Sequence, residues 1–299
     1  MTLWKLANGR SISLHEPRLM AILNITPDSF SDGGKLATAD DAVRTAEQFA
    51  AQGACVLDIG GESTRPGSTP VAAEEQLRRI LPVVRAIRSR RSLDHVAISI
   101  DTTSGAVAEQ TLLAGADAIN DVSGMADDGE KMIGILRKSG AGYVLMHRRL
   151  PSPQESYSDG YSAAPAYTDV VGQIRDFLSA GLTRLESEGV SRERVVVDPG
   201  LGFGKTVDQC LQLIGRTPEL LTLGRPVLSG LSRKSFVGRI SLGRDSTPDE
   251  RLPGTLSLSM EHFRAGARLF RVHDVAAHAE IFAISRPSGA MNPVDKSGI

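Results

Sequence analysis

Short apolar runs alternate along this chain with longer segments in which apolar residues recur at helical spacing. Eight runs each lead into a polar residue, and they cover residues 19–23, 54–57, 96–100, 116–119, 142–146, 194–197, 226–228 and 267–270. Strands that alternate with helices predict an α/β fold with a parallel sheet. Eight such units are the number that closes a (β/α)8 barrel, or TIM barrel, for which about 250 residues suffice.

The polar residues after these runs are the first candidates for a functional site. They are Asn24, Asp58, Asp101, Asn120, His147, Asp198, Ser232, Arg271 and His273. In a (β/α)8 barrel the active site lies at the C-terminal ends of the strands. The pattern therefore predicts that residues far apart in the sequence gather around one site.

Helical spacing predicts the segments between the strands, and the turn signals predict an additional hairpin. The expected helices cover residues 39–52, 72–89, 104–114, 130–139, 169–188, 208–221, 233–240, 254–265 and 275–285. Asn8-Gly9 separates two short alternating runs, which is a strong hairpin signal. We expect this hairpin to close the bottom of a single barrel domain over residues 1–285. The Pro/Gly/Ser-rich residues 286–299 are expected to form a disordered tail.

Composition narrows the possible partners and the cellular location. The net charge of −1 and the absence of a basic tract make no case for binding nucleic acid or an anionic membrane. The longest apolar runs are too short to span a membrane, and the first residues lack a signal-peptide core. Cys55 and Cys210 are far apart and have apolar neighbours, which indicates buried free thiols in a reducing compartment. We therefore predict a cytoplasmic protein.

The loops after the first two strands combine glycines with residues suited to a flat or anionic ligand. An aromatic residue in a polar loop, such as Phe30, suits a lid over a flat substrate, although it could pack beneath a solvated turn. In the second loop, Arg65 can bind two phosphate oxygens with its planar guanidinium. An ion pair between Arg65 and Glu62 is the alternative.

Two carboxylates and an amide follow apolar strands, at positions where a dry barrel interior makes unpaired polar groups costly. A pair such as Asp101 and Asp198, together with Asn120, suits a heterocycle with a guanidine-like edge, because each carboxylate can accept two N–H donors. The alternative is that each aspartate caps the helix that follows. That alternative suits Asp101 better, because Pro199 and Gly200 follow Asp198.

Three further segments near the strand ends carry glycines or positive charge. Residues 198–206 invite a P-loop interpretation, but Pro199 stands where that motif requires glycine, so we reject it. Lys234 lies at the barrel mouth opposite the aspartates, in the first turn of an expected helix, and a helix N-terminus attracts anions. Strand alternation sends Arg271 and His273 to one side, and together they suit a phosphate-like group.

Seven motifs in register now point to one family. They are LNITPDSFSDGG (23–34), DIGGESTRPG (58–67), SIDT (99–102), IND (119–121), DPGLGFGK (198–205), SRKS (232–235) and RVHD (271–274). Together they resemble bacterial dihydropteroate synthases over about residues 19–284. The resemblance implies a (β/α)8 barrel that is usually a homodimer. It also implies a transferase of folate biosynthesis, sensitive to sulfonamides, which mimic aminobenzoate.

The activity implied by the resemblance joins 6-hydroxymethyl-7,8-dihydropterin pyrophosphate to 4-aminobenzoate with the help of Mg²⁺. The products are 7,8-dihydropteroate and pyrophosphate. The implied pterin site contains the catalytic residues Asp101, Asp198 and Lys234, with Asn120, Met146 and Phe203. Asn24 would bind Mg²⁺ or pyrophosphate, and the phosphates would be held by Arg65, Arg271 and His273. The aminobenzoate pocket would contain Phe30, Thr64, Pro66 and Ser235.

One segment departs from the family pattern, and two other functions are alternatives to the synthase. After Met146 and His147 the family commonly shows Gly, Pro and Thr-Met-Gln, whereas residues 148–157 here read RRLPSPQESY, which leaves this loop's conformation open. A pterin-dependent corrinoid methyltransferase shares the barrel and the carboxylates but has no evident need for the basic cluster. A non-catalytic pterin-binding barrel would not require the intact loop motifs.

Overall fold

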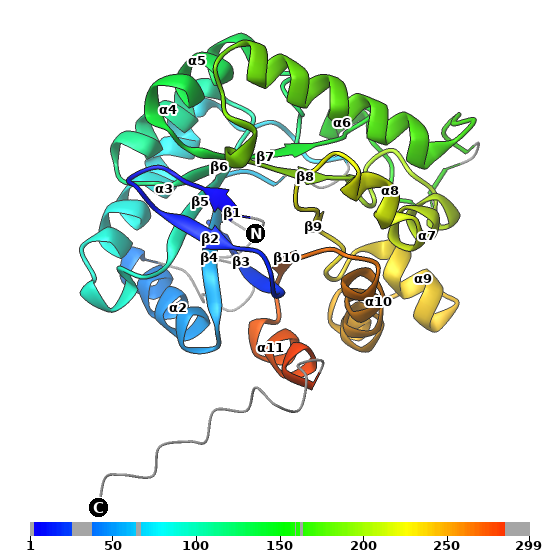
Figure 1. Ribbon diagram of the computed structural model, residues 1–299. Helices are drawn as coiled ribbons and strands as arrows, with labels where there is room; N and C mark the ends of the chain where they lie inside the picture. Colours follow the sequence, from blue (N-terminus) through cyan, green and yellow to red (C-terminus); the bar gives the residue numbers. More distant parts are fainter. Residues whose placement is uncertain (1–2, 26–37, 64–66, 159, 162–163, 285–299) are drawn as a thin grey trace, which may run out of the picture.

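The computed structural model describes residues 3–25, 38–63, 67–158, 160–161 and 164–284, and eight parallel strands form its centre. The strands are β3 (Arg18–Asn24), β4 (Ala54–Gly60), β5 (Ala97–Asp101), β6 (Ala118–Asp121), β7 (Gly142–Met146), β8 (Val195–Asp198), β9 (Leu228–Ser229) and β10 (Leu269–Val272). Their order is β8-β7-β6-β5-β4-β3-β10-β9, and a bridge between Val197 and Val227 brings the two ends together. Figure 1 shows the strands as a ring with helices around it, which confirms the predicted barrel.

The strands form where apolar runs can be buried on both faces. Every residue of β5 and β7 is buried, as expected for parallel strands covered by helices outside and by packed side chains inside. The shortest strand differs from the prediction, because β9 spans only two residues rather than 226–228. Pro226 has no N–H to donate to a neighbouring strand, and only its carbonyl takes part, accepting from the amide of Val197 at 3.0 Å.

The helices follow the strands in the predicted order. They are α2 (Ala39–Ala51), α3 (Ala73–Arg88), α4 (Gly105–Leu113), α5 (Gly129–Ser139), α6 (Val170–Ser187), α7 (Val207–Gly215), α8 (Thr217–Leu221), α9 (Ser235–Leu242), α10 (Leu252–Arg264) and α11 (Val275–Ile284). Capping boxes at Thr38 and Thr206 start α2 and α7, because each hydroxyl accepts from the third helical amide while that residue's side chain binds back.

The single helix predicted over residues 208–221 is wrong, because the structure contains two helices there. The chain breaks between α7 and α8 at Arg216. Pro218 has no N–H for the helical ladder and therefore suits the first turn of a new helix. The hydroxyl of Thr217 donates to the carbonyls of Leu213 and Ile214, which fastens the new helix to the old one.

The predicted hairpin closes the bottom of the barrel. Strands β1 (Leu3–Lys5) and β2 (Ser11–Ser13) pair antiparallel, and Asn8 and Gly9 have φ values of 58° and 71°, as a type I′ turn requires. Trp4, Leu6 and Leu14 pack against residues from the strands, among them Met20 and Val56. Figure 1 shows the hairpin lying across one end of the ring.

A buried carboxylate fastens this hairpin to the barrel wall. Asp117 forms ion pairs with Arg88 and Arg10 and accepts hydrogen bonds from the side chain of Asn8 and the amide of Ile98. No part of the Asp117 side chain is exposed. Because each of its oxygens has partners, this carboxylate can be buried without an uncompensated charge.

Several predictions concern residues outside those described. They include most of the loop after β3, residues 64–66 and the expected tail at 286–299. Both cysteines are free thiols as predicted, with Cys210 buried and Cys55 partly so. No helix in the described part of the chain is long and apolar enough to cross a membrane.

Candidate active site

A cavity of about 520 Å³ lies at the C-terminal ends of the strands. Every predicted site residue that falls within the described residues lines it. These are Asn24, Asp101, Asn120, Met146, Asp198, Phe203, Lys234, Ser235, Arg271 and His273. The predicted residues Phe30, Thr64, Arg65 and Pro66 lie outside the described residues. Closure of the barrel therefore brings together side chains separated by up to about 250 positions in the chain.

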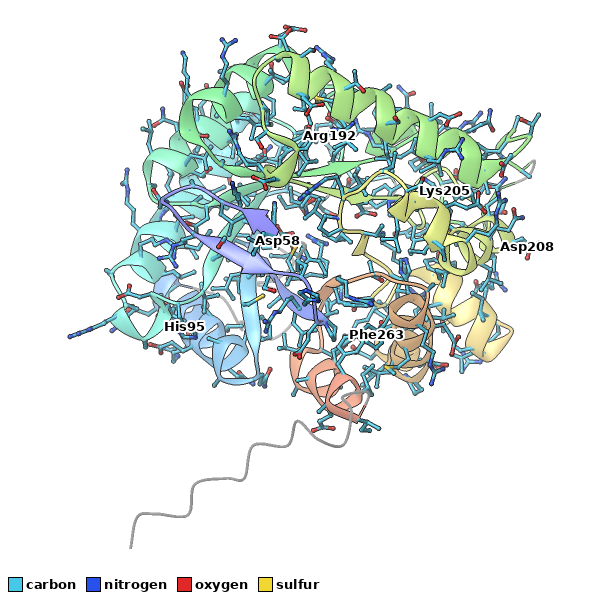
Figure 2. All side chains as sticks on the ribbon, in the orientation of Figure 1. Asp58, His95, Arg192, Lys205, Asp208 and Phe263 are labelled. Carbon is cyan, nitrogen blue, oxygen red and sulfur yellow. The ribbon has the colours of Figure 1, made fainter. Side chains whose placement is uncertain are left out.

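Asp101 and Arg271, which line this cavity, form a polar network with the fully buried Asp58. Arg271 donates from Nε to Asp58 Oδ2 and from Nη2 to Asp101 Oδ2, each at 2.6 Å. Asn120 donates from Nδ2 to the same Asp58 oxygen at 3.0 Å. Figure 2 labels Asp58 near the middle of the ring of strands. The arrangement holds two carboxylates, an amide and a guanidinium at defined positions on four different strands.

The carboxylates in this network retain capacity to accept further hydrogen bonds. Asp58 Oδ1 and Asp101 Oδ1 are buried and have no partner within the part of the chain that is described. Burial raises the pKa of Asp101 to about 7, although the charge of Arg271 opposes that shift. Buried polar atoms are nearly always hydrogen-bonded in folded proteins, so these oxygens are suited to N–H donors of a ligand.

Arg271 has two carboxylate partners that the sequence analysis did not predict. We expected it to face a phosphate, but two carboxylates engage its Nε and Nη2 atoms. Asp58 was among the polar residues at the strand ends, but the sequence analysis assigned it no role in the site. The available signal was its place at the end of an apolar run, which it shares with Asp101.

Asp198 and Lys234 form another wall of the cavity. Asp198 Oδ1 accepts from the amide of Gly200 at 2.7 Å, and Lys234 Nζ donates to the carbonyl of Leu201 at 2.5 Å. A Cβ at Gly230 would lie 3.4 Å from Asp198 Oδ2 and 3.9 Å from Lys234 Nζ, so both groups project toward the same space. Burial raises the pKa of Asp198 and lowers that of Lys234 to about 8, while the attraction between the two charges opposes both shifts.

An apolar face lies beside these charged groups. Val122, Met146 and Phe203 form a separate buried cluster within the cavity wall. Lys234 Nζ lies 4.4 Å from the centre of the Phe203 ring, which is a cation–π distance. The cavity thus combines carboxylates that accept hydrogen bonds with apolar surface suited to a flat ring.

The loops after β9 and β10 contribute a serine, a histidine and a helix N-terminus to the cavity. Ser232 Oγ lies 3.0 Å from His273 Nδ1, and it also accepts from the His273 amide at 3.3 Å. Helix α9 begins at Ser235, and its N-cap residue, Lys234, makes no side-chain cap. Free N–H groups at such an end favour a negatively charged ligand group.

Arg233 also lines the cavity, but its guanidinium is engaged by a carboxylate. Its guanidinium donates to both oxygens of Asp274, at 2.8 and 2.5 Å, and its φ of 58° lies in the left-handed region. This fork joins the loop after β9 to the loop after β10. It holds Ser232 and His273 next to each other.

The structure excludes one of the alternatives that the sequence left open. Ser104, rather than Asp101, caps α4 by accepting from the Val107 amide, so the cap interpretation of Asp101 is wrong. Glu62 accepts from the amide of Val71 at 2.8 Å and from Gln76 Nε2 at 2.9 Å. Its alternative partner, Arg65, lies outside the described residues.

The loop after β7, whose sequence departs from the family pattern, packs on the glycine-rich loop after β8. Tyr167 donates its hydroxyl to the Gly204 carbonyl at 3.1 Å, and Gln209 Nε2 donates to the Pro165 carbonyl at 3.0 Å. Tyr157 from this loop lines the cavity with its side chain nearly half exposed. Sequence reasoning missed Tyr157, because no pattern in residues 148–157 marks it.

The fold and the site define a class of enzyme. A family described as pterin binding enzyme matches residues 20–273, so the chain belongs to the pterin-binding enzymes. Within that class its relatives are dihydropteroate synthases. The Synechocystis enzyme is 41% identical over 89% of this chain and 88% of its own length. The Mycobacterium leprae enzyme is 40% identical over 91% of this chain and 94% of its own. The chain is a member of the dihydropteroate synthase family.

Solved structures agree with this assignment. The Xanthomonas albilineans dihydropteroate synthase with 4-aminobenzoic acid has a TM-score of 0.84 and 38% identity, covering 97% of this chain and 100% of that one. The Thermus thermophilus enzyme in complex with 6HMPPP has a TM-score of 0.77 and 37% identity, covering 95% and 98%. These relatives favour the synthase over the corrinoid methyltransferase and the non-catalytic barrel.

Proposed function

We propose that this chain condenses 6-hydroxymethyl-7,8-dihydropterin pyrophosphate with 4-aminobenzoate to give 7,8-dihydropteroate and pyrophosphate. The observation that carries the proposal is the pairing of buried carboxylates with an apolar face inside one cavity. Asp101 and Asp198 offer acceptors there, and Met146 and Phe203 offer apolar surface. A pterin has both a guanidine-like edge and a flat ring, so the two parts of the cavity match the two parts of the molecule.

The carboxylates also suit the charge that develops during the reaction. The C–O bond between the pterin methylene and pyrophosphate breaks, and pyrophosphate leaves with both electrons. The remaining cation is delocalised into the pterin, where the negative charges of Asp101 and Asp198 stabilise it. The aniline nitrogen then forms the new C–N bond and releases one proton. An arylamine is unprotonated at neutral pH, so the step needs no strong general base.

Aminobenzoate and pyrophosphate are assigned to the outer rim. The carboxylate of aminobenzoate would lie near Ser235, because the free N–H groups at the start of α9 favour an anion. Phe30, Thr64 and Pro66 would complete this pocket, and Arg65 would approach the phosphates. Of the predicted phosphate ligands, His273 is held at the rim by Ser232. In the proposal Arg271 still binds the phosphates, through the N–H groups that Asp58 and Asp101 leave unused.

The residues present fit a Mg²⁺ ion bound together with the diphosphate. Magnesium is commonly held by one or two protein oxygens and by substrate phosphates rather than by a cage of side chains. Asn24 offers a side-chain amide oxygen to the cavity, and no cluster of three or more His, Cys, Asp or Glu suited to a metal occurs among the described residues. When bound, the ion would neutralise charge on the leaving pyrophosphate.

We also infer a homodimer. Phe177, Leu211 and Leu221 are each more than one third exposed, and they lie on α6, α7 and α8, which pack against one another. Exposed apolar side chains on adjacent helices are typical of subunit interfaces. Light scattering at micromolar concentration should give twice the chain mass, and a monomer mass would refute the inference. The cytoplasmic location stays a prediction.

The decisive experiment measures pyrophosphate release from the pterin substrate in Mg²⁺ buffer, with and without 4-aminobenzoate. Release that depends on aminobenzoate and yields dihydropteroate supports the proposal, and removal of Mg²⁺ with EDTA should abolish most of it. Tight pterin binding without turnover would refute it. A sulfonamide should compete with aminobenzoate, since the Yersinia pestis enzyme has been solved in a sulfonamide drug complex. Inhibition that aminobenzoate cannot relieve would contradict the assigned pocket.

A further inference from the structure

Lys205 is a fully buried lysine that the proposed reaction does not use. Its relative exposure is 0%, and it is not among the residues that line the cavity. It ends the DPGLGFGK segment, whose resemblance to a P-loop was rejected above. Figure 2 labels it on the side of the barrel where α7 and α8 lie. A buried ammonium is costly unless its hydrogens find partners, so its surroundings need an explanation.

Three acceptors surround the ammonium group of Lys205. Nζ donates to the Phe203 carbonyl at 2.6 Å and to the His147 carbonyl at 3.3 Å, and it lies 3.0 Å from His147 Nδ1, which accepts from the ammonium form of the lysine. In the described part of the chain, no carboxylate lies within ion-pair distance of it. A lysine ammonium has three hydrogens, so these contacts use all of its donors. It therefore has no hydrogen left for a phosphate.

The protonation states of Lys205 and His147 are consistent with this geometry. Burial lowers the pKa of Lys205 to about 7. Burial and the neighbouring ammonium lower the pKa of His147 to about 2, so the imidazole is neutral. Because Nδ1 accepts from Lys205, the imidazole proton must be on Nε2. The His147 ring is also fixed by an edge-on contact with Phe177, with centroids 4.9 Å apart.

The acceptors of Lys205 belong to the loops after β7 and β8, which adjoin Met146 and Phe203, the apolar wall proposed to contact the pterin. His147 directly follows Met146, and its amide donates to the Asp198 carbonyl at 3.0 Å. Phe203 itself supplies the other carbonyl. Met146 and Phe203 are two of the three residues in the apolar cluster of the cavity. Lys205 thus joins the backbone beside one member of this wall to the backbone of another.

We propose that Lys205 is a positioning residue, which clamps the loops after β7 and β8 together so that Met146 and Phe203 present a preformed surface to the pterin ring. The inference rests on the proposed function, because it takes the pterin as the ligand of that wall. Lys205 touches neither substrate. It acts through the carbonyl of Phe203 and through both acceptors of His147.

The test compares Lys205→Met with Lys205→Gln and with the exposed control Lys138→Met. Methionine keeps most of the length of the side chain but leaves two buried carbonyls without a donor, which is unfavourable. We expect the KM for the pterin substrate to rise on the order of tenfold, which corresponds to about 1.4 kcal/mol. The KM for aminobenzoate should stay within about twofold, because neither Met146 nor Phe203 belongs to its proposed pocket. Lys205→Gln keeps two donors and should show a smaller loss.

A lysine that only stabilises the fold would give another result. Lys205→Met would then melt at a lower temperature, but its KM values for the pterin substrate and for aminobenzoate would equal those of the unchanged protein. That result would overturn the inference. If Lys205→Met does not fold, Lys205→Gln carries the same comparison. Failure of the proposed function is distinguishable, since the unchanged protein would then form no dihydropteroate.

A spectroscopic test needs no variant. The chain has 6 histidines, so ¹⁵N labelling of histidine leaves few signals to assign. His147 should show an unprotonated Nδ1 and a protonated Nε2 and should not titrate between pH 5 and 8. A midpoint near pH 6.5 would contradict the burial of His147 against Lys205 and with it the clamp.

Discussion

Replacing Asp198 with asparagine tests the proposed pterin site most directly. The Asp198 side chain is 5% exposed, and one oxygen is occupied by the Gly200 amide at 2.7 Å. The second oxygen lies beside Gly230, in the space shared with Lys234. Asparagine has almost the same shape. It can keep the bond to Gly200 through its carbonyl oxygen, so the change alters mainly what the cavity offers to a ligand.

The expected loss of affinity follows from the groups that face the ligand. The variant replaces a charged acceptor with an N–H₂ donor opposite the N–H donors of the pterin. A hydrogen bond to a charged group contributes about 2 kcal/mol, and a buried donor without a partner costs about 1 kcal/mol. The sum of about 3 kcal/mol corresponds to an increase of roughly 100-fold in Kd. We therefore expect Asp198→Asn to bind the pterin substrate about two orders of magnitude more weakly.

Stability should change much less than affinity. Burial raises the pKa of Asp198, so the ionised carboxylate is less favourable in the folded protein than in the unfolded chain, and a neutral amide removes that cost. Lys234 loses its nearest negative charge in return, but its pKa is already lowered to about 8, so it can release its proton. These effects oppose each other, and we expect the melting temperature to shift by no more than about 4 °C.

Calorimetric titration with the pterin substrate, without aminobenzoate, measures the affinity, and a thermal melt monitors the fold. Asp176→Asn on the exposed face of α6 is the matched control, because it makes the same chemical change away from the cavity. Unchanged pterin affinity in folded Asp198→Asn would remove Asp198 from the site. A large loss of stability with normal affinity would show that the carboxylate is structural.

Three further predictions concern stability. Asp117→Asn should lower the free energy of unfolding by about 3 kcal/mol, because it leaves the half-buried Arg88 without its ion pair. Activity per folded molecule should stay normal. Urea unfolding and an activity assay check these two results, and a loss of stability below about 1 kcal/mol would contradict the first. Gly200→Ala should unfold or inactivate the protein, because the φ of Gly200 is +68° and a Cβ there would clash with a backbone carbonyl. Gly134 in α5 has open space around it, so Gly134→Ala should stabilise the protein by about 0.5–1 kcal/mol. Equal melting temperatures of the two variants would refute this contrast. The pKa of Asp101 is raised to about 7 in the folded protein, above its value of about 4 in the unfolded chain, so its contribution to stability is present at low pH and is lost as the pH rises through 7. Asp101→Asn should therefore gain stability relative to wild type between pH 5 and 8 in urea titrations, and parallel pH profiles would argue against the shift.

The strand ends are the part of the site that was predictable from sequence. Parallel strands buried on both faces read as apolar runs, and a polar residue at the end of such a run is conspicuous. Asp101, Asn120 and Asp198 were identified in this way, and all three line the cavity. Glycine motifs and the order of segments added Phe203, Lys234 and Ser235 through the family resemblance.

Pairings between distant elements were not predictable. The ion pairs from Arg271 to Asp58 and Asp101 form only because β10 lies beside β3 and next but one to β4 in the closed barrel. The sequence separation between Arg271 and Asp58 is 213 residues, and no local periodicity relates them. A phosphate therefore looked like the natural partner of Arg271. The break between α7 and α8 was missed for a local reason, because the apolar spacing continues across Pro218.

The sequence by itself determined the alternation of strands and helices, the hairpin turn at Asn8 and Gly9, and the set of polar residues at the strand ends. These depend on neighbours within a few positions, through turn geometry and the periodicity of burial. The tertiary structure alone decided which charges neutralise each other and which are left for a ligand. Burial and distance control those energies, and both arise only when the barrel closes and brings Arg271 to Asp101 and Lys205 to His147.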